Sequence, residues 1–221
     1  MAVYDLEEQE QLDELKTWWK QYGNLVTALV VAAALGVVAW QAWNWWQRSQ
    51  AAQAGAVYGA LEQAVSARDA KKAREAAGEL IDKYSSTTYA GLAALLSAKV
   101  QTETGDLKTA KLQFAWAAEH AKDRELRDLA RLRLAAVLAD EKSYDEALKQ
   151  LTSEPAAPFA PRYAEQKGDI LAAQGKTAEA KAAYDAALAK LDEAEKGAAD
   201  QRRGAYREVL QIKRESLGPR S

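Results

Sequence analysis

The segment Gly105-Asp-Leu-Lys-Thr-Ala110-Lys-Leu-Gln-Phe114-Ala-Trp-Ala117 decides the fold, because its spacing of small and aromatic residues returns later in the chain. An alanine stands five residues after the glycine, an aromatic residue four further on, and a second alanine three further on. The same offsets join Gly175, Ala180, Tyr184 and Ala187. A middle copy has Ala147 and Leu151 at the matching positions, with Lys142 where the glycine stands. The chain therefore contains an internal repeat.

The repeat length and the residue types predict pairs of antiparallel helices. The first alanines of the three copies (Ala110, Ala147 and Ala180) are 37 and 33 residues apart, close to the period of about 34 residues in tetratricopeptide repeats. Twelve residues before each stands a small residue, which lets the first helix of a pair (helix A) approach the second (helix B): Ala98, Ala135 and Gly168. Gly105 and Gly175 predict the end of helix A with a positive φ. We expect three tetratricopeptide-like units.

Helix-forming residues extend on both sides of these units. Ala, Leu, Glu, Lys, Arg and Gln dominate, and the chain has only four prolines. A degenerate fourth unit is expected before the others, with helices near 51–67 and 69–84. A last helix over roughly 200–216 is expected to cap the open end of the stack with its apolar edge of Tyr206, Val209, Leu210 and Ile212. Residues 48–221 are therefore predicted to form an α-solenoid domain with a C-terminal capping helix.

A long apolar segment precedes the repeats. No charged residue occurs from Gln21 to Gln47, and a helix needs roughly 20 mostly apolar residues to cross a bilayer. We expect an acidic tail over residues 1–20 and a transmembrane helix over residues 21–47, so the predicted fold class is all-α with one N-terminal transmembrane helix. A buried core helix and a cleaved signal peptide are the alternatives. The acidic tail and the bulky tryptophans after the apolar core oppose a signal peptide.

Aromatic residues flank the apolar segment at two levels, where tryptophan prefers the interface between lipid and water. The predicted interface anchors are Trp18, Trp19, Tyr22, Trp40, Trp43, Trp45 and Trp46. Two lysines precede the segment and only Arg48 follows closely, which favours a cytoplasmic N-terminus. Ala28, Ala32 and Gly36 share a face on which a second membrane helix could pack. The general abundance of alanine is the alternative explanation of this pattern.

The residue content excludes several kinds of chemistry. There is no cysteine, and the single histidine, His120, has no ligand partners nearby in the sequence. Carboxylates alternate with lysine and arginine at helical spacing, which predicts solvated helix faces rather than an acid–base pair. A net charge of −2 is not typical of a nucleic-acid-binding protein. We expect a protein that is not an enzyme, has no cofactor and takes no small-molecule substrate.

The acidic tail, the block Trp18-Trp-Lys-Gln-Tyr-Gly-Asn24, a single span that ends in tryptophan and the repeats together resemble the YfgM family, the ancillary subunits of the bacterial SecYEG translocon. The resemblance covers the whole chain, and the N-terminal block is its specific part. It implies an inner-membrane protein with a cytoplasmic N-terminus and a periplasmic domain. It also implies association with the translocon and with the membrane-anchored periplasmic chaperone PpiD.

Two functions are compatible with the sequence. The first is a non-catalytic protein-binding scaffold, tethered to the inner membrane, that assists secretory-protein translocation or periplasmic chaperone networks. The alternative is a cytoplasm-facing, membrane-tethered structural adaptor unrelated to secretion. The side of the membrane on which the C-terminal domain lies distinguishes the two.

The repeat register also predicts which residues meet a partner. In stacked helix pairs, the A helices line the concave side, which usually takes the ligand. The predicted partner-binding residues are Leu92, Leu95, Lys99, Leu129, Leu132, Ala136, Arg162, Glu165 and Asp169. Packing in the core is the alternative role of the four leucines. The polar members are expected to be exposed to solvent and free to meet the partner.

Overall fold

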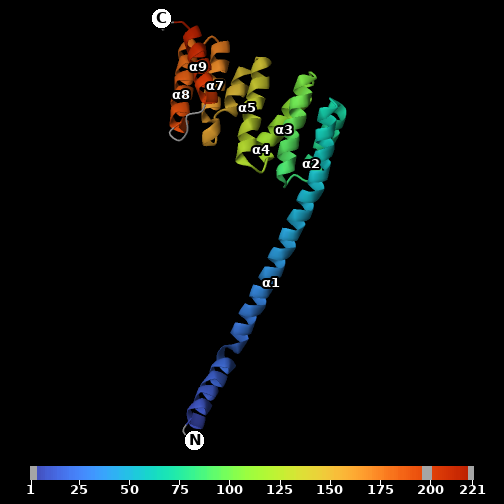
Figure 1. Cartoon of the computed structure of the whole chain (residues 1–221), viewed down its shortest axis with the longest axis vertical. Helices are drawn as coiled ribbons and strands as arrows, with labels where there is room; N and C mark the ends of the chain where they lie inside the picture. The colour runs from blue at the N-terminus through green and yellow to red at the C-terminus, as the bar shows by residue number, and fades with distance from the viewer. Residues whose placement is uncertain (1–3, 196–200, 219–221) are drawn as a thin grey trace. The chain divides into compact units, whose positions relative to one another are not determined.

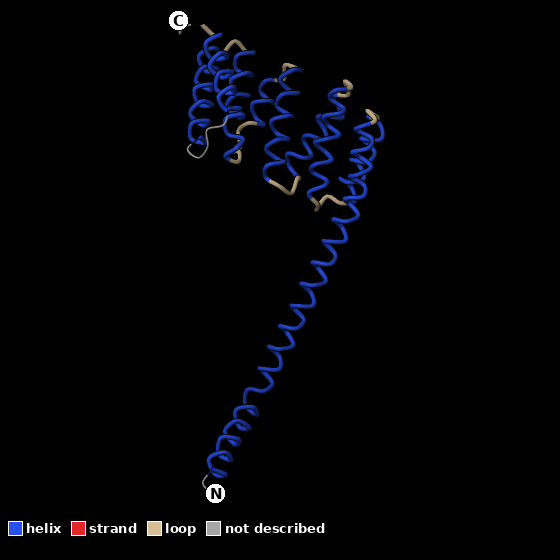
Figure 2. Tube along the Cα trace, viewed as in Figure 1, coloured by secondary structure: helices blue, strands red, loops and turns tan. Residues whose placement is uncertain are grey.

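The computed structural model describes residues 4–195 and 201–218, which are helical apart from short turns (Figures 1 and 2). These described residues contain no β-strand, so the predicted all-α class is confirmed. The first three residues of the acidic tail lie outside the described range. The chain divides into two units, residues 1–50 and residues 51–221, and each is described by itself. The first helix, α1 (Tyr4–Ser66), contributes to both.

In the first unit, α1 carries the segment predicted to cross the membrane. Among the described residues it is the one helix that is long and apolar enough to span a bilayer, and its apolar window is not buried against the protein. This exposure opposes the alternative of a buried core helix. The seven predicted anchor side chains are also exposed. Their two levels lie about 30 Å apart along a helix that rises 1.5 Å per residue, which matches a bilayer.

The second unit is a row of helical hairpins, in which A and B helices alternate (Figure 1). The A helices are the end of α1 (residues 51–66), α3 (Thr88–Glu103), α5 (Arg124–Asp140) and α7 (Ala160–Ala173). The B helices are α2 (Ala70–Lys83), α4 (Leu107–His120), α6 (Tyr144–Gln150) and α8 (Thr177–Glu195). A 3₁₀ turn, η1 (Ala157–Phe159), precedes α7, and α9 (Gln201–Ser216) follows α8.

The turn between helix A and helix B has the same conformation in all four hairpins. One residue in each turn has a positive φ: 55° at Arg68, 85° at Gly105, 62° at Lys142 and 75° at Gly175. The N–H of the next residue donates to the carbonyl five residues earlier at 2.8–2.9 Å, as Asp106 does to Gln101. This is a Schellman-type end of helix A. The prediction for Gly105 and Gly175 is confirmed, and Lys142 adopts the same conformation without being glycine.

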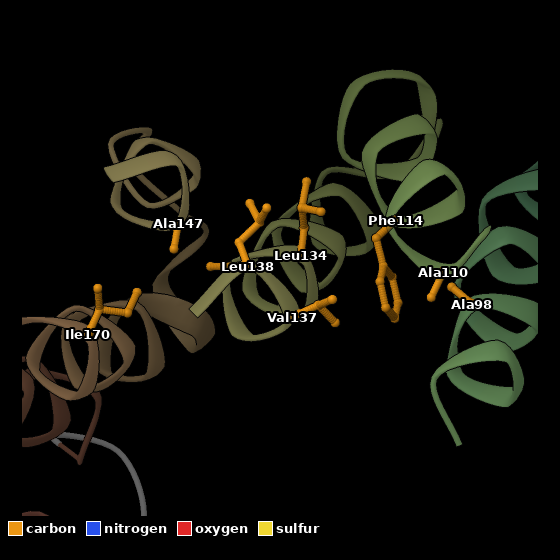
Figure 3. Close-up of a cluster of buried hydrophobic side chains, with 9 residues drawn as sticks. Ala98, Ala110, Phe114, Leu134, Val137, Leu138, Ala147 and Ile170 are labelled. Atoms are coloured by element: carbon orange, nitrogen blue, oxygen red, sulfur yellow. The ribbon is translucent and has the colours of Figure 1, made fainter. Parts of the chain in front are cut away.

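Small residues let the paired helices approach, as the repeat pattern predicts. The first alanine of each copy is fully buried, and Ala98 and Ala110 lie together in one core cluster with Phe114 (Figure 3). A Cβ added at Gly168 would lie 2.6 Å from Cε1 of the Tyr184 ring. Real Cβ atoms do not come so close, so only glycine fits there without moving the ring. The predicted close contacts are confirmed.

The first hairpin follows the same register with its residue sizes exchanged. Ala73 is fully buried five residues after Arg68, at the position of the key alanines. Leu61 on helix A and Ala77 on helix B stand where Gly168 and Tyr184 stand in the last hairpin, and both are fully buried in one cluster. A large residue on helix A thus fills the space that Phe114, Leu151 or Tyr184 fills in the other hairpins. This exchange explains why the sequence signature of this unit is weak.

Candidate functional site

A groove of about 570 Å³ opens between the A helices α3 and α5. Phe114 of α4 reaches it from between these helices, and Tyr58 from the end of α1 also borders it. Its apolar lining from α3 and α5 consists of Leu92, Leu95, Leu96, Leu126, Leu129, Ala136 and Val137. The leucines of this lining are half-buried, not fully enclosed in the core. The groove therefore exposes apolar surface that the hairpins themselves do not cover.

Charged side chains form the rest of the groove wall. Lys99 and Glu103 come from α3, with Thr102 beside them, and Arg133 and Asp140 come from α5. Nζ of Lys99 lies 3.8 Å from Oε1 of Glu103, and both side chains are exposed, so this ion pair is weak. Two cations and two anions leave the wall without a net side-chain charge.

Five of the nine residues predicted to bind a partner lie in this groove: Leu92, Leu95, Lys99, Leu129 and Ala136. Leu132 is half-buried and does not line it. The structure therefore brings the α3 and α5 members of the prediction together on one surface. That this surface binds a partner stays a prediction.

The remaining three predicted residues, on α7, contact the capping helix instead. Nζ of Lys213 on α9 lies 2.8 Å from Oε1 of Glu165 and 2.7 Å from Oδ2 of Asp169. The Tyr206 hydroxyl donates to Oε2 of Glu165 at 2.9 Å. The Arg162 guanidinium lies 3.8 Å from the centroid of the Tyr206 ring. Arg162, Glu165, Asp169, Tyr206 and Lys213 are called the cap joint below.

The expected exposure of the polar residues is wrong for Glu165, which is only 7% exposed. The physical reason is that α9 covers this part of α7, and that Lys213 of α9 joins Arg162 of α7, 3.0 Å from Oε2 of Glu165, in supplying the cations that a buried carboxylate needs. Asp169 is half-buried and also accepts a hydrogen bond from the Tyr184 hydroxyl at 2.8 Å. Neither carboxylate is free on the surface. Both carboxylates are thus bound by the capping helix.

The cap joint shifts the pKa values of its members. Burial alone would raise the pKa of Glu165, but hydrogen bonds from Lys213 and Tyr206 outweigh it and hold that pKa below its usual value. Burial alone would lower the pKa of Lys213, but its bonds to Asp169 and Glu165 leave that pKa raised. Burial, followed by the charge of Glu165, raises the pKa of Tyr206. Both ends of the ion pair are therefore stabilised in their charged forms.

The predicted apolar edge of α9 is only partly buried. Leu210 is fully buried and Tyr206 is half-buried, whereas Val209 and Ile212 are exposed. The residues of α9 that dock are Tyr206, Leu210 and Lys213, which lie on one helix face at spacings of four and three. Val209 and Ile212 lie beside that face. The capping role of α9 is thus observed, but Val209 and Ile212, two of the four residues predicted to dock, stay exposed.

Asp128 on α5 is a buried carboxylate that the sequence did not single out. Its Oδ2 accepts from the N–H of Ala156 at 2.8 Å, and its backbone carbonyl accepts from the Tyr163 hydroxyl at 3.1 Å. Arg131 lies 3.2 Å from its Oδ1. Burial and the nearby Asp128 raise the pKa of Tyr163 to about 12. Asp128 of α5 thus binds both the proline-containing linker before α7, through Ala156, and α7 itself, through Tyr163. In the sequence it stands in a run of alternating charges that resembles a solvated face.

The described residues contain no cluster of three or more His, Cys, Asp or Glu suited to a metal ion. The imidazole of His120 stacks on Trp116 with centroids 5.5 Å apart, and its Nδ1 lies 3.2 Å from the Trp116 carbonyl oxygen. His120 is the last residue of α4, and its ring contacts the preceding turn of the same helix. The groove and the cap joint can bind side chains and backbone.

An exposed apolar helix, followed by stacked hairpins with an open groove, defines a membrane-anchored scaffold of the tetratricopeptide-repeat class. A family model described as a tetratricopeptide repeat-like domain matches residues 16–219. The chain is 34% identical over 218 residues to the ancillary SecYEG translocon subunit of Neisseria gonorrhoeae, covering 98% of this chain and 100% of that protein. It is 31% identical over 186 residues to the Haemophilus influenzae protein of the same name, covering 84% and 90% of the two chains.

The Escherichia coli protein of that name is 29% identical over 188 residues, which cover 85% of this chain and 90% of that protein. This chain belongs to the family of ancillary SecYEG translocon subunits with a tetratricopeptide repeat-like domain. The predicted membership of the YfgM family is confirmed.

Proposed function

We propose that this protein is a non-catalytic scaffold that binds proteins at the SecYEG translocon through the groove between α3 and α5. The observation that carries the proposal is the apolar lining of this groove, where half-buried leucines of α3 and α5 gather on one surface. Covering apolar surface releases roughly 25 cal/mol per Å², so a partner's apolar side chains gain free energy by entering the groove. The names of the relatives, which are translocon subunits, identify the assembly in which such a partner is to be sought.

The proposal includes a topology. Residues 21–47 cross the inner membrane, the N-terminus is cytoplasmic, and residues 48–221 lie in the periplasm. The excess of lysine before the span supports this orientation. A reporter that is active only outside the cytoplasm, fused after Ser221, should be active. An inactive reporter would support the alternative, a cytoplasm-facing structural adaptor.

The groove is tested by replacing Leu129 with glutamate in the full chain. A charge buried against the apolar surface of a bound partner is costly, so recovery of the translocon with the variant should fall about tenfold, the result of a loss of about 1.4 kcal/mol. Leu112→Glu is the matched control, because Leu112 is 65% exposed on α4 and does not line the groove. If both variants recover the translocon like the wild type, and both unfold like it, the groove is not the binding surface.

We also propose that α1 packs against a partner helix within the membrane, and that the protein associates with the chaperone PpiD. Ala28, Ala32 and Gly36 are exposed on one face of α1, and a side chain added at Gly36 would meet no atom within 4 Å in this chain. A partner helix could therefore approach closely there. Gly36→Leu should reduce co-purification of the translocon and PpiD while leaving membrane insertion intact. Unchanged recovery would leave the abundance of alanine as the explanation.

A further inference from the structure

The groove between α3 and α5 is apolar at one end and charged at the other. Leu92 and Leu95 lie in the N-terminal half of α3, and Leu126 and Leu129 in the N-terminal half of α5. The charged wall residues come later in each helix: Lys99 and Glu103 on α3, and Arg133 and Asp140 on α5. Because α3 and α5 are A helices of successive hairpins, they run in the same direction (Figure 1). The leucines of the two helices therefore share one end of the groove.

The charged end has a negative bias. Glu103 is the last residue of α3 and Asp140 the last residue of α5, and neither helix has a basic residue in its last turn. A helix C-terminus carries the equivalent of about half a negative charge. Two carboxylates and two helix C-termini thus lie at this end, and the N-termini of α4 and α6 begin four residues later. Lys99 and Arg133 stand one to two turns farther back, so the negative bias comes from the placement of the two carboxylates. Within the described part of the chain, Asp140 has no ion-pair partner, and Glu103 has only its weak pair with Lys99.

We infer that the groove takes a protein segment in which bulky aliphatic or aromatic residues are followed or preceded directly by lysine or arginine. The apolar residues lie against the leucines of α3 and α5, and the cation lies over Glu103 and Asp140. This inference rests on the proposed function only in placing the partner in this groove. The charge complementarity is what selects this segment over an acidic one.

The test uses the full chain in nanodiscs of phosphatidylcholine, which has no net charge, and two fluorescent synthetic peptides. Both peptides share one apolar core containing leucine and phenylalanine, flanked at both ends by two lysines in one and by two glutamates in the other. Flanking both ends makes the result independent of the direction of binding. In low salt, fluorescence anisotropy should show that the lysine peptide binds about three- to tenfold more tightly, as expected for a few exposed charge pairs. The preference should shrink when the salt concentration is raised.

The decisive variant is Glu103→Lys with Asp140→Lys, which should reverse the preference in favour of the glutamate peptide. Lysine in the last turn suits the helix dipole, so the variant is expected to fold. Glu75→Lys with Glu119→Lys is the matched control, because both residues are exposed outside the groove and the net charge changes equally. A preference that stays the same in the decisive variant, or that changes equally in the control, overturns the inference. So does the failure of both peptides to bind the wild type.

The two proposals fail separately. If Leu129→Glu loses the translocon but the peptides show no charge preference, the groove remains the binding surface and the inferred partner chemistry is wrong. If the peptides behave as expected but Leu129→Glu keeps the translocon, the groove binds such segments and the translocon is held elsewhere.

Discussion

Equivalent positions of the A helices form an open groove in the middle of the domain and a closed joint at its C-terminal end. Leu92, Leu129 and Arg162 are equivalent by the repeat spacing of 37 and 33 residues, as are Leu95, Leu132 and Glu165. Between α3 and α5, the leucines Leu92, Leu95 and Leu129 at these positions border the groove. On α7, the polar residues instead bind Tyr206 and Lys213 of α9. The same backbone positions thus serve two different purposes.

This difference shows that the repeat register alone does not identify a binding face. It places residues on the concave side, but the chemistry of those residues decides whether a neighbouring helix covers them. A carboxylate there can be paired by a cation from the next helix, which closes the surface. Leucine offers no such directional partner, so the surface stays available for an apolar ligand.

Among the substitutions considered, the largest destabilisation of the C-terminal end of the domain is expected at Gly168. Alanine there would place its Cβ 2.6 Å from Cε1 of Tyr184, whose hydroxyl is held by Asp169. Overpacking of this kind should lower the free energy of unfolding by about 2–3 kcal/mol. Thermal unfolding followed by circular dichroism measures this as a fall in the melting temperature. Gly59→Ala is the control, since a Cβ at that helical site meets nothing within 4 Å. It should be neutral or stabilising, and a similar loss in both variants would contradict the account.

Removing Lys213 tests the joint by charge. Lys213→Ala leaves the buried Glu165 with Arg162 of α7 as its remaining cation and removes the cation of α9. This should destabilise the docking of α9 by about 2 kcal/mol, less than for a fully buried pair because Lys213 is partly exposed and Arg162 remains. Hydrogen exchange of α9 amides should accelerate, while that of α3 stays unchanged. Arg214→Ala removes an exposed ion pair with Asp185 and should cost under about 0.5 kcal/mol. Equal acceleration in the two variants would refute a special role of Lys213.

The same joint predicts a pH window for the docking of α9. The pKa of Glu165 lies below its ordinary value of 4.5, so its contribution is present above pH 4.5 and is lost as the pH falls through the lowered pKa. The pKa of Lys213 lies above 10.5, so its contribution is present below pH 10.5 and is lost as the pH rises through the raised pKa. Amide exchange of α9, corrected for its intrinsic pH dependence, should show constant protection between these limits. A loss of protection near neutral pH would be inconsistent with this pair.

The smallest expected effect concerns the turn that follows α5. Lys142 has a φ of 62°, which glycine adopts more easily, so Lys142→Gly should stabilise the domain by about 0.5–1 kcal/mol. Gly175→Ala, at a φ of 75°, should destabilise it by a similar amount. Chemical denaturation of both variants checks the opposite signs. Two changes of the same sign would show that the turn conformation does not control stability here.

Much of the fold could be predicted from sequence because the repeat is a spacing of small and large residues. The positions of Gly105, Gly175 and the key alanines follow from it, and the structure agrees. The register of the first hairpin could not be read in the same way, because Leu61 and Ala77 exchange the usual sizes. One sequence signal of its register remained. Ala73 stands five residues after Arg68 and 37 residues before Ala110.

The candidate site was predictable where it depends on helix register and not where it depends on distant contacts. Register alone places Leu92, Leu95 and Leu129 on the groove. The pairing of Asp169 with Lys213 joins residues 44 apart in the chain, and no local pattern reveals it. The docking of α9 therefore had to be seen in three dimensions.

The central claim is that partners enter the groove between α3 and α5 and not the cap joint on α7. Site-specific photo-crosslinking in membranes tests it most directly, with the photoreactive residue placed at Leu129 in the groove, at Arg162 in the cap joint, or at the exposed Leu112 on α4. Translocon adducts are expected from position 129, and none above background from positions 162 and 112. Adducts from position 162 with none from position 129 would contradict it.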